Sequence, residues 1–525
     1  MSDAVKKDVD WKPSHNIWLV AVVVTLGAFM EVLDTTIVNV SLPHIAGNLA
    51  VSYDDATWAL TSYLLANGIV LTVSGWLSSV FGRKRYFLIC IAGFTLCSFL
   101  CGIASNLPEL VIFRLLQGFF GGGLQPNQQS IILDTFPPAQ RGKAFAITAV
   151  ATIIAPVLGP TLGGLLTDSY GWRWVFFINV PVGVATFFAV HALVEDPPWA
   201  KARPRGIDYI GLSLITLGLG SLEFVMDRGQ ELDWFGSNFI VAMAVLAFLG
   251  IAGAIAWLLY AENPVVDLRV LADRNFAIGC VMIAAMASVL YASAIVIPQF
   301  AQQELGYTAL LAGLILSPGG IVIILLIPLV SQVTKIVPLK YVIAFGFFIM
   351  GCSLLYSHRL VPDLDFWTLA KMRAFQTTGL AFMFVPISTI TFATLPRSSN
   401  ADGSALFTMS RNYFGSLSIS AATALVQNRS QVHQAYLSDH TSRLDLGYVM
   451  TFDRVQQDLL RQGHAAATTA QEATNWLYQQ LHTQAAVMAY SDVFLTTAIL
   501  SFVLVPICLL ASRKAVKGGG APAAH

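Results

Sequence analysis

The sequence contains little charge. Of its 525 residues only 11% are Asp, Glu, Lys or Arg, whereas soluble domains carry about 25%. Hydrophobic residues make up 56% of the chain, and the mean hydropathy is +0.67. The 30 basic and 30 acidic side chains cancel, so net charge gives no reason to expect a nucleic acid as a partner. This composition excludes a soluble globular domain and predicts a protein that crosses the membrane many times.

Signatures of cofactor and metal chemistry are also missing. No GxxxxGK[ST] loop occurs, and no hydrophilic stretch is long enough to form a nucleotide-binding domain, which argues against an ATP-driven pump. The six cysteines all fall in apolar segments without a paired metal-ligand spacing, so we expect them to be packing residues. We therefore expect no metal, no cofactor and no enzymatic activity.

Hydropathy divides the chain into fourteen candidate membrane spans. A helix of about 20 residues crosses the hydrocarbon core of a bilayer. The candidates lie at residues 17–40, 57–80, 86–104, 108–133, 144–166, 174–194, 208–226, 239–260, 276–300, 309–331, 340–357, 370–393, 403–427 and 487–511. The first span follows a polar tail and has no small-residue cleavage site after it, so we expect it to be retained. We predict an all-α integral membrane protein.

Basic residues collect in alternate loops. That set contains Arg83, Lys84, Arg85, Arg141, Lys143, Lys201, Arg203, Arg205, Arg269, Arg274, Lys335, Lys340 and Arg397. The two tails, 1–16 and 512–525, carry further lysines and arginines, whereas the opposite short loops hold only Arg173, Arg228 and Arg359. By the positive-inside rule, both termini are expected in the cytoplasm.

The two ends of the chain repeat each other at an offset close to 260 residues. Arg114-x-x-Gln117 recurs as Arg373-x-x-Gln376, and Pro126 recurs as Pro386. The repeat predicts two six-helix halves of similar topology, with two inserted helices between them. We place the halves at 17–200 and 263–511 and the inserted helices at 201–262. Parallel repeats are typical of transporters that bind substrate near the midplane.

The last outward segment, residues 428–486, is the only long one. It is polar, and residues 453–481 alternate at helical spacing. The apolar anchors of that pattern are Leu459, Leu460, Trp476, Leu477 and Leu481. We predict a small extracytoplasmic helical cap that offers a docking surface to a partner, with a disordered loop as the alternative.

Two carboxylates lie inside the first span. Glu31 and Asp34 are three residues apart and therefore share one face of a helix. A charge at that depth costs roughly 2.5 to 3.5 kcal/mol, so such groups normally face a protein interior or a wet cavity. Either acid could carry a proton, and we favour Asp34. A structural carboxylate, protonated or paired with an arginine, is the alternative.

Three motifs combine glycine with charge or proline. Residues 75–85 place cations at a helix end after a glycine turn, residues 113–126 place an arginine and a glycine run within the membrane, and residues 155–166 can bend a helix and admit a close neighbour. Their principal residues are Gly75, Gly82, Arg83, Lys84, Arg114, Gly159, Pro160, Gly163 and Gly164.

These motifs resemble those of the major facilitator superfamily. Residues 75–85 resemble its loop motif, although Ser79 stands where the family has an acid. Residues 113–126 resemble its proton-transfer motif, and residues 155–166 resemble the antiporter motif of its drug exporters, which is thought to seal the cytoplasmic side. Together with residues 33–43, 172–183, 227–234 and 263–276, they resemble the fourteen-span drug:proton antiporters, especially the EmrB-type permeases.

The resemblance implies a 6+2+6 secondary transporter of the bacterial inner membrane. It implies export of hydrophobic or amphipathic drugs in exchange for protons, with Arg114 as the charge partner of Asp34 or Glu31. It also implies a tripartite system, in which a periplasmic adaptor and an outer-membrane channel join the pump and the cap contacts the adaptor. Export of one endogenous metabolite or siderophore is the alternative. A membrane enzyme or a receptor would need a catalytic cluster or a signalling domain, and the sequence contains neither.

Further polar side chains within the spans are candidates for lining a substrate cavity, although most such groups hold helices together. The candidates are Asn39, Gln125, Gln128, Glu223, Gln376 and Arg411.

Overall fold

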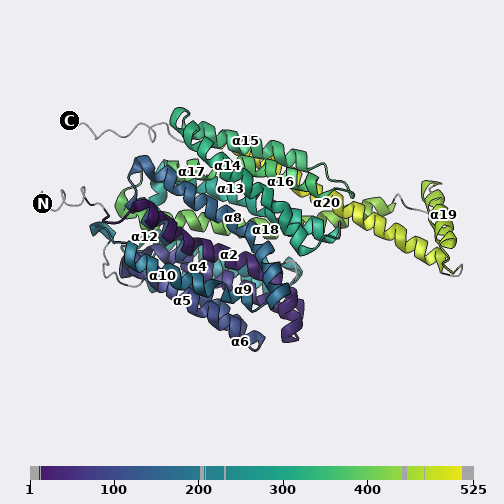
Figure 1. Cartoon of the computed structure of the whole chain (residues 1–525), viewed down its shortest axis with the longest axis horizontal. Coiled ribbons are helices and arrows are strands. Elements are labelled where there is room, and N and C mark those ends of the chain that lie inside the picture. The colour runs from purple at the N-terminus through teal and green to yellow at the C-terminus, as the bar shows by residue number, and fades with distance from the viewer. Residues whose placement is uncertain are drawn as a thin grey trace.

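The structure is a computed structural model that describes residues 11, 13–200, 206, 208–229, 232–439, 441, 446–465 and 468–510. These residues form helices joined by short connections, and they contain no β-strand. Figure 1 shows the helices lying side by side along the long axis of the molecule. Most of the two predicted tails, and the basic residues predicted at 201–205, lie outside the described residues.

The N-terminal helices match the first six predicted spans. They are α2 (Ile17–Leu49), α4 (Trp58–Phe81), α5 (Arg83–Ile103), α6 (Leu107–Gly121) with α7 (Leu124–Thr135), α8 (Pro138–Tyr170), and α9 (Trp174–Phe177) with α10 (Asn179–Leu193). A short α3 (Tyr53–Ala56) links α2 to α4, and η1 (Pro198–Ala200) follows α10. The α4–α5 turn needs Gly82, whose φ is +83°.

The remaining long helices match the other eight spans, and one further helix, α19 (Leu446–Arg461), lies outside them. The two inserted helices are α11 (Tyr209–Arg228) and α12 (Asn238–Tyr260). They are followed by α13 (Arg274–Gln303), α14 (Ala309–Ile336), α15 (Leu339–Ser357), α16 (Phe366–Ala381) with α17 (Phe384–Thr391), α18 (Asn400–Asp439), α19 (Leu446–Arg461) and α20 (Thr469–Leu509). Short 3-10 helices lie at η2 (Trp234–Gly236), η3 (Leu268–Ala272) and η4 (Arg397–Ser399).

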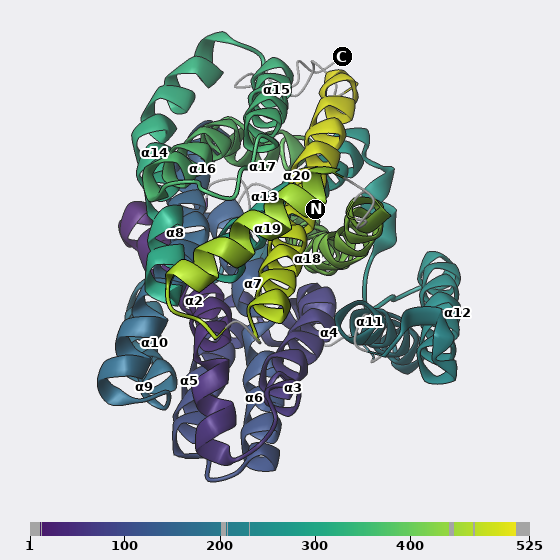
Figure 2. The same cartoon turned by 90° about the vertical axis from the view of Figure 1, so that its right-hand side faces the viewer.

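The helix pairings repeat between the two halves. α2 packs on α8 and α10, and α13 packs on α18 and α20 in the same way. α6 packs on α4 and α5, as α16 packs on α14 and α15. The halves meet where α18 contacts α4 and α7, and where α8 contacts α14 and α17. Figure 2 shows α11 and α12 at one side of the molecule, where α11 packs on both α4 and α18 while α12 packs mainly on α11.

Two of the predicted spans differ from the rest in polarity. Within the described residues, eleven helices are long and apolar enough to cross a membrane, and α8, with a 43° bend, makes a twelfth. The α6–α7 pair and α18 complete the set of fourteen but do not meet that test. Every residue of α7 is buried, and α7 and α18 contact each other between the halves. α7 is therefore surrounded by protein instead of lipid, so its polar side chains are tolerated there.

The outward segment is more regular than we predicted. α18 and α20 are 40 and 41 residues long, or about 60 Å at ~1.5 Å per residue, twice the thickness of the hydrocarbon core. Both spans therefore continue beyond the core as a stalk, and α19 packs on α20 (Figure 1). The helical spacing predicted over 453–481 is present in two helices, α19 and the start of α20, because the chain turns at Gly463, which has a φ of +91°. Leu460 and Trp476, expected as anchors, are exposed.

Candidate functional site

A buried ion pair connects α2 to α6 inside the N-terminal half. Arg114 Nη1 donates to Asp34 Oδ2 at 2.5 Å, and both side chains are 0% exposed. The other carboxylate oxygen accepts from Gln117 Nε2 at 3.0 Å and from Asn179 Nδ2 at 2.8 Å. Asp34 therefore has one full positive charge and two amide dipoles around it, so its negative charge is compensated inside the protein.

Aromatic rings and tight helix packing hold the arginine in place. The Arg114 guanidinium lies 4.1 Å from the centroid of the Tyr63 ring, and its Nε donates to the carbonyl of Ala59 at 2.9 Å. α6 approaches α4 closely because of Gly118, where a Cβ would lie only 2.2 Å from the Tyr63 carbonyl oxygen. The glycine of this motif thus lets α6 carry the guanidinium against the Tyr63 ring and the Ala59 carbonyl of α4.

Glu31 has different surroundings, although it lies one turn from Asp34. Its carboxylate accepts from Asn67 Nδ2 at 3.1 Å and from Gln125 Nε2 through a short hydrogen bond. Among the described residues, no lysine, arginine or histidine nitrogen lies within ion-pair distance of it, and Glu31 is only 3% exposed. The two acids share one helix, as predicted, but only Asp34 has a cationic partner in contact.

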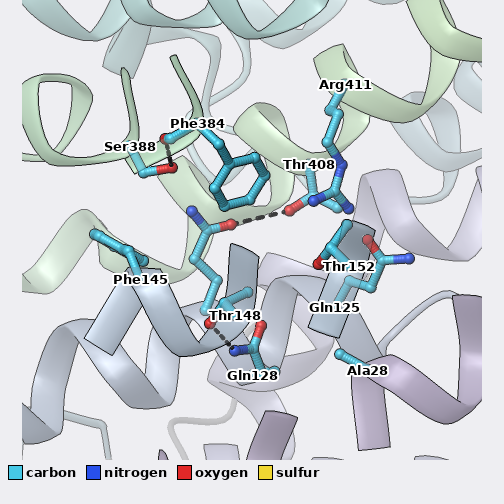
Figure 3. Close-up of a pocket in the computed structure, with 11 residues that line it drawn as sticks. Ala28, Gln125, Gln128, Phe145, Thr148, Thr152, Phe384, Ser388, Thr408 and Arg411 are labelled. Carbon is cyan, nitrogen blue, oxygen red and sulfur yellow. Dashed lines mark hydrogen bonds between the residues drawn. The ribbon is translucent and has the colours of Figure 1, made fainter. Parts of the chain in front are cut away.

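A small polar cavity lies between the halves. Its lining residues are Ala28, Gln125, Gln128, Gln129, Phe145, Thr148, Thr152, Phe384, Ser388, Thr408 and Arg411. Figure 3 shows these side chains converging from helices of both halves. Gln128 Nε2 donates to Thr148 Oγ1 at 2.8 Å, and Thr408 Oγ1 donates across the interface to Gln129 Oε1 at 3.2 Å. The volume is about 10 Å³, room for roughly one water molecule, so the two halves are closed on each other here.

Three of the six candidate cavity residues line this space, namely Gln125, Gln128 and Arg411. The other three do not. Asn39 is exposed on α2, and Gln376 donates to Ser357 Oγ at 2.9 Å inside the C-terminal half. Glu223 accepts from Ser416 Oγ at 2.7 Å where α11 meets α18.

Sequence analysis missed several threonine and glutamine side chains of the cavity. Thr148 and Thr152 are four residues apart on α8 and therefore share a face. Gln129 follows a candidate residue directly. The helical spacing of Thr148 and Thr152 was a signal that could have found them.

The C-terminal half contains a counterpart of the buried ion pair without its acid. Arg373 Nη1 donates to Ser293 Oγ at 2.9 Å and to Gln376 Oε1 at 3.3 Å. Ser293 stands 259 residues after Asp34, and Arg373 stands 259 residues after Arg114. Arg373 is 3% exposed, and its Nε has no hydrogen-bond partner. The repeat therefore preserves the arginine but has a hydroxyl in place of the carboxylate.

Ser293→Asp is expected to complete this second ion pair and raise the free energy of unfolding by about 1.5 to 3 kcal/mol, the value of a hydrogen bond to a charged group. Thermal unfolding of the purified protein in detergent measures the effect. Ser353→Asp is the matched control, because Ser353 is equally buried and donates only to Met350. Equal destabilisation by both variants would contradict the prediction.

At one end of the bundle the halves are joined by polar contacts. We call it the basic end, because it carries Arg83, Arg141, Arg274 and Arg397. Arg83 forms an ion pair with Asp134 at the end of α7, and Asn400 Nδ2 of α18 donates to Asp134 Oδ1 at 2.8 Å. A carboxylate thus binds α5 and the start of α18 together.

The loop motif contributes to the same contact. A Cβ at Gly75 would lie 2.9 Å from Asp402 Oδ1 and 3.0 Å from Asp402 Cα, so this glycine admits the start of α18. Ser79, which stands where the family has an acid, donates to the carbonyl of Trp76. Asp134 is the acid that sequence analysis missed, and it pairs with Arg83 from another helix.

The connection after α10 also lies at the basic end. The backbone N–H of Lys84 donates to Asp196 Oδ1 at 2.8 Å. Burial raises the pKa of the Asp196 carboxyl, and the Lys84 N–H and the charge of Arg83 act in the opposite direction. Glu195, which is partly buried, accepts from the Ser14 hydroxyl, and this hydrogen bond lowers its pKa. The start of α2 is thereby bound to the end of α10.

The antiporter motif packs α8 against α2. A Cβ at Gly159 would lie 2.1 Å from Thr36 Oγ1, and one at Gly163 would lie 2.9 Å from the Ile37 carbonyl oxygen. Pro160 faces the other half, since a Cβ at Gly313 of α14 would lie 2.9 Å from its Cβ. A Cβ at Gly164, in contrast, would meet no described atom within 4 Å. The motif therefore joins α2, α8 and α14.

Comparison with known proteins identifies the family. Residues 24–419 match the model of the Major Facilitator Superfamily. The chain is 36% identical to the multidrug export protein EmrB of Escherichia coli (strain K12), over 98% of this chain and 99% of that protein. It is 34% identical to the fatty acid resistance protein FarB of Neisseria gonorrhoeae, over 98% and 100%.

Solved structures agree on the fold. The proton:xylose symporter XylE matches with a TM-score of 0.56 at 15% identity, covering 93% of this chain and 96% of that one. The human organic anion transporter MFSD10 matches with a TM-score of 0.56 at 13% identity, covering 93% and 99%. With its repeated halves, the two inserted helices and the family's motifs in contact with one another, the chain belongs to the major facilitator superfamily of transporters, and within it to the family that includes EmrB.

Proposed function

We propose that this transporter is a proton-coupled antiporter that exports hydrophobic or amphipathic drugs and other toxic compounds across the bacterial inner membrane. The observation that carries the proposal is the fully buried Asp34–Arg114 ion pair on α2 and α6. A charged group at that depth is costly, so an ionisable residue there is a candidate for a functional role. This ion pair also joins two helices of one half. The similarity to a protein named for multidrug export supports the direction and the substrate class.

Protonation of Asp34 is the coupling step. A proton arriving from the periplasm neutralises the carboxylate and removes its attraction for Arg114, whose own charge is permanent. Gln117 and Asn179 then lose a charged acceptor, so α2, α6 and α10 are held together less strongly. The empty carrier turns inward, and loss of the proton to the cytoplasm re-forms the pair before the next outward movement. No cofactor takes part, since the proton-motive force supplies the energy.

The basic end is the cytoplasmic gate in this proposal. Arg83, Asp134 and Asn400 close it, together with the contact of Gly75 with Asp402. The first and last described segments both lie at this end. Ser14 donates to Glu195, and Arg274 donates to the carbonyl of Leu510. The positive-inside rule supports the proposal that this end, and both termini with it, face the cytoplasm.

The stalk at the opposite end is the proposed contact for a periplasmic adaptor and, through it, an outer-membrane channel. α18 and α20 are tied together there, since Arg429 Nε and His433 Nε2 both contact Asp492 Oδ2, at 2.5 and 2.8 Å. A groove of about 480 Å³ lies between α18, α19 and α20. A rigid support with a groove suits a helical partner better than a disordered loop would.

The second candidate function is export of a single endogenous metabolite or siderophore by the same mechanism. The name of a relative with 34% identity refers to fatty acid resistance, which is a narrower role than multidrug export. A resistance profile restricted to one chemical class would favour this candidate. An enzymatic role has no support from the site, where amides and threonines surround the cavity.

Drug-induced proton release from inverted proteoliposomes tests the proposal. Native protein, Asp34→Asn and Glu31→Gln are compared under the same proton gradient. We expect proton counterflow with native protein, loss of at least about a hundredfold in Asp34→Asn, and retention of most of the flux in Glu31→Gln, because only Asp34 is paired with Arg114. Counterflow that survives in Asp34→Asn would overturn the assignment of Asp34. The absence of counterflow with every drug would overturn antiport.

A further inference from the structure

The inserted helix α11 is bound to the N-terminal half along one face. Gly220, Phe224 and Arg228 are four residues apart and therefore share that face. A Cβ at Gly220 would contact side chains of α4 at 3.5 and 3.8 Å, and the Phe224 ring lies 6.1 Å from the Trp58 ring. Arg228 Nη2 donates at 2.6 Å to Thr57, the N-cap residue of α4, and its guanidinium lies 4.8 Å from the centroid of the Trp58 ring. α11 is therefore held on α4 by polar and aromatic contacts.

A second face of α11 contacts the C-terminal half. Glu223 Oε1 accepts from Ser416 Oγ of α18 at 2.7 Å, and Glu223 is only 9% exposed. Tyr413 lies one turn before Ser416 and reaches across to α4, where a Cβ at Gly68 would lie 2.8 Å from its hydroxyl oxygen. The Glu223–Ser416 hydrogen bond thus lies where α4, α11 and α18 meet, at the side of the molecule that carries the inserted helices (Figure 2).

This contact is close to the central cavity along α18. Arg411 lines the cavity, and Ser416 follows it by five residues, or about 7.5 Å along the helix axis. The cavity has room for about one water molecule, so loading of a larger ligand requires α18 to move away from α7. α7 belongs to the N-terminal half, to which α11 is bound. The same movement therefore carries Ser416 away from Glu223.

We propose that Glu223 is a positioning residue that holds the halves together, because its hydrogen bond to Ser416 stabilises the closed arrangement and breaks when α18 moves. The inserted helix α11 is thereby a brace across the seam between α4 and α18. At the other seam, Gly313 of α14 lies against Pro160 of α8, far from the inserted helices (Figure 2). This inference goes beyond the proposed function, since it concerns the movement of the halves and holds for any cargo.

Cysteine labelling in the cavity tests the proposal without a drug or a proton gradient. Thr148→Cys places a thiol among the lining residues, where the closed cavity excludes a water-soluble maleimide. The six native cysteines are buried or half-buried, and their labelling is subtracted by using the protein without Thr148→Cys. The rate is measured on the full-length protein in nanodiscs, at reagent concentrations where it is proportional to the open fraction.

Three variants and one control are compared in this background. The variants are Ser416→Ala, Glu223→Gln and the two combined. Ser418→Ala is the matched control, because Ser418 is also half-buried on α18 but donates to the carbonyl of Gly415 in its own helix at 2.7 Å. Size-exclusion chromatography and thermal unfolding establish that each variant is folded.

We expect Ser416→Ala to raise the labelling rate by roughly threefold to tenfold, the change in population that corresponds to one lost hydrogen bond. Glu223→Gln should raise the rate less, because its amide oxygen still accepts from the Ser416 hydroxyl. The double variant should label no faster than Ser416→Ala alone, since the hydrogen bond is already absent there. Ser418→Ala should change the rate by less than about twofold.

Three results would overturn the inference. They are an unchanged rate in Ser416→Ala, an equal increase in Ser418→Ala, and effects that multiply in the double variant, which would show that Glu223 and Ser416 act separately. The expected labelling pattern in a protein without proton counterflow would sustain the brace and refute the antiport mechanism. Proton counterflow with an unchanged labelling rate in Ser416→Ala would do the reverse.

Discussion

Arg114→Met is expected to lower the free energy of unfolding by about 3 to 5 kcal/mol and to abolish proton-coupled export. Removing one partner of a buried ion pair leaves the other charge uncompensated, and that charge costs far more than the pair itself contributes. Asp34 would retain only the amides of Gln117 and Asn179 as partners. The transporter would then lack the charge pair whose formation and loss couple proton movement to the cycle.

A double variant separates stability from function. Asp34→Asn with Arg114→Met removes both charges, so its free energy of unfolding should recover by about half or more of the loss, while transport stays absent. Arg173→Met is the matched control: this arginine also stacks on a ring, Trp172, but it is partly exposed and lies at the protein surface. Its change should be within about 1 kcal/mol. A stable Arg114→Met protein that still exports drug would show that the pair is dispensable.

The depth of the charged groups was predictable from sequence, whereas their pairing was not. Hydropathy placed Asp34 and Arg114 in the membrane, where a lone charge is too costly to be left without a partner. Asn179 lies 145 residues from Asp34 in the chain, and no local pattern relates the two. The same holds for Asp134, which pairs with Arg83 from a different helix. Long-range contacts of this kind require the packing of helices in space.

Three of the six candidate cavity residues line the cavity and three lie elsewhere, and the sequence could not separate them for a related reason. A polar residue within a span must satisfy its hydrogen bonds, but the sequence does not say whether it faces the interface between the halves or another helix. Gln376 and Gln128 look alike in sequence, yet the first binds Ser357 inside one half and the second lines the cavity. The repeat was the better guide, because it correctly related the Arg114 and Arg373 clusters.

In the outward segment, the apolar stretch and the helix end at different residues. Apolar residues end near Val426 on α18, and the predicted span ended there too, but the helix continues to Asp439. A helix satisfies its own backbone groups in water as in lipid, so it has no physical reason to stop at the membrane surface. Polar residues then mark the change of solvent and leave the secondary structure unchanged. For that reason, much of the segment that we predicted as a separate cap consists of the continuations of α18 and α20.

Gly159→Ala is expected to reduce export by at least about tenfold and to lower the free energy of unfolding by about 1 to 3 kcal/mol, the usual cost of an overpacked site. The new methyl group would lie 2.1 Å from Thr36 Oγ1 and 2.6 Å from Thr36 Cβ, so α2 or α8 must shift. Thr36 is two residues from Asp34 on the same helix, and a displaced α2 would disturb the geometry of the ion pair with Arg114. Gly164→Ala is the control on the same helix, since nothing lies within 4 Å of its new methyl group. It should leave export unchanged and raise the free energy of unfolding by up to about 1 kcal/mol, because alanine favours a helix over glycine.

Thermal unfolding and drug-driven proton flux are measured for both variants. If the two alanines behave alike, then the close approach of α8 to α2 is not what the motif provides, and its glycines act through flexibility instead.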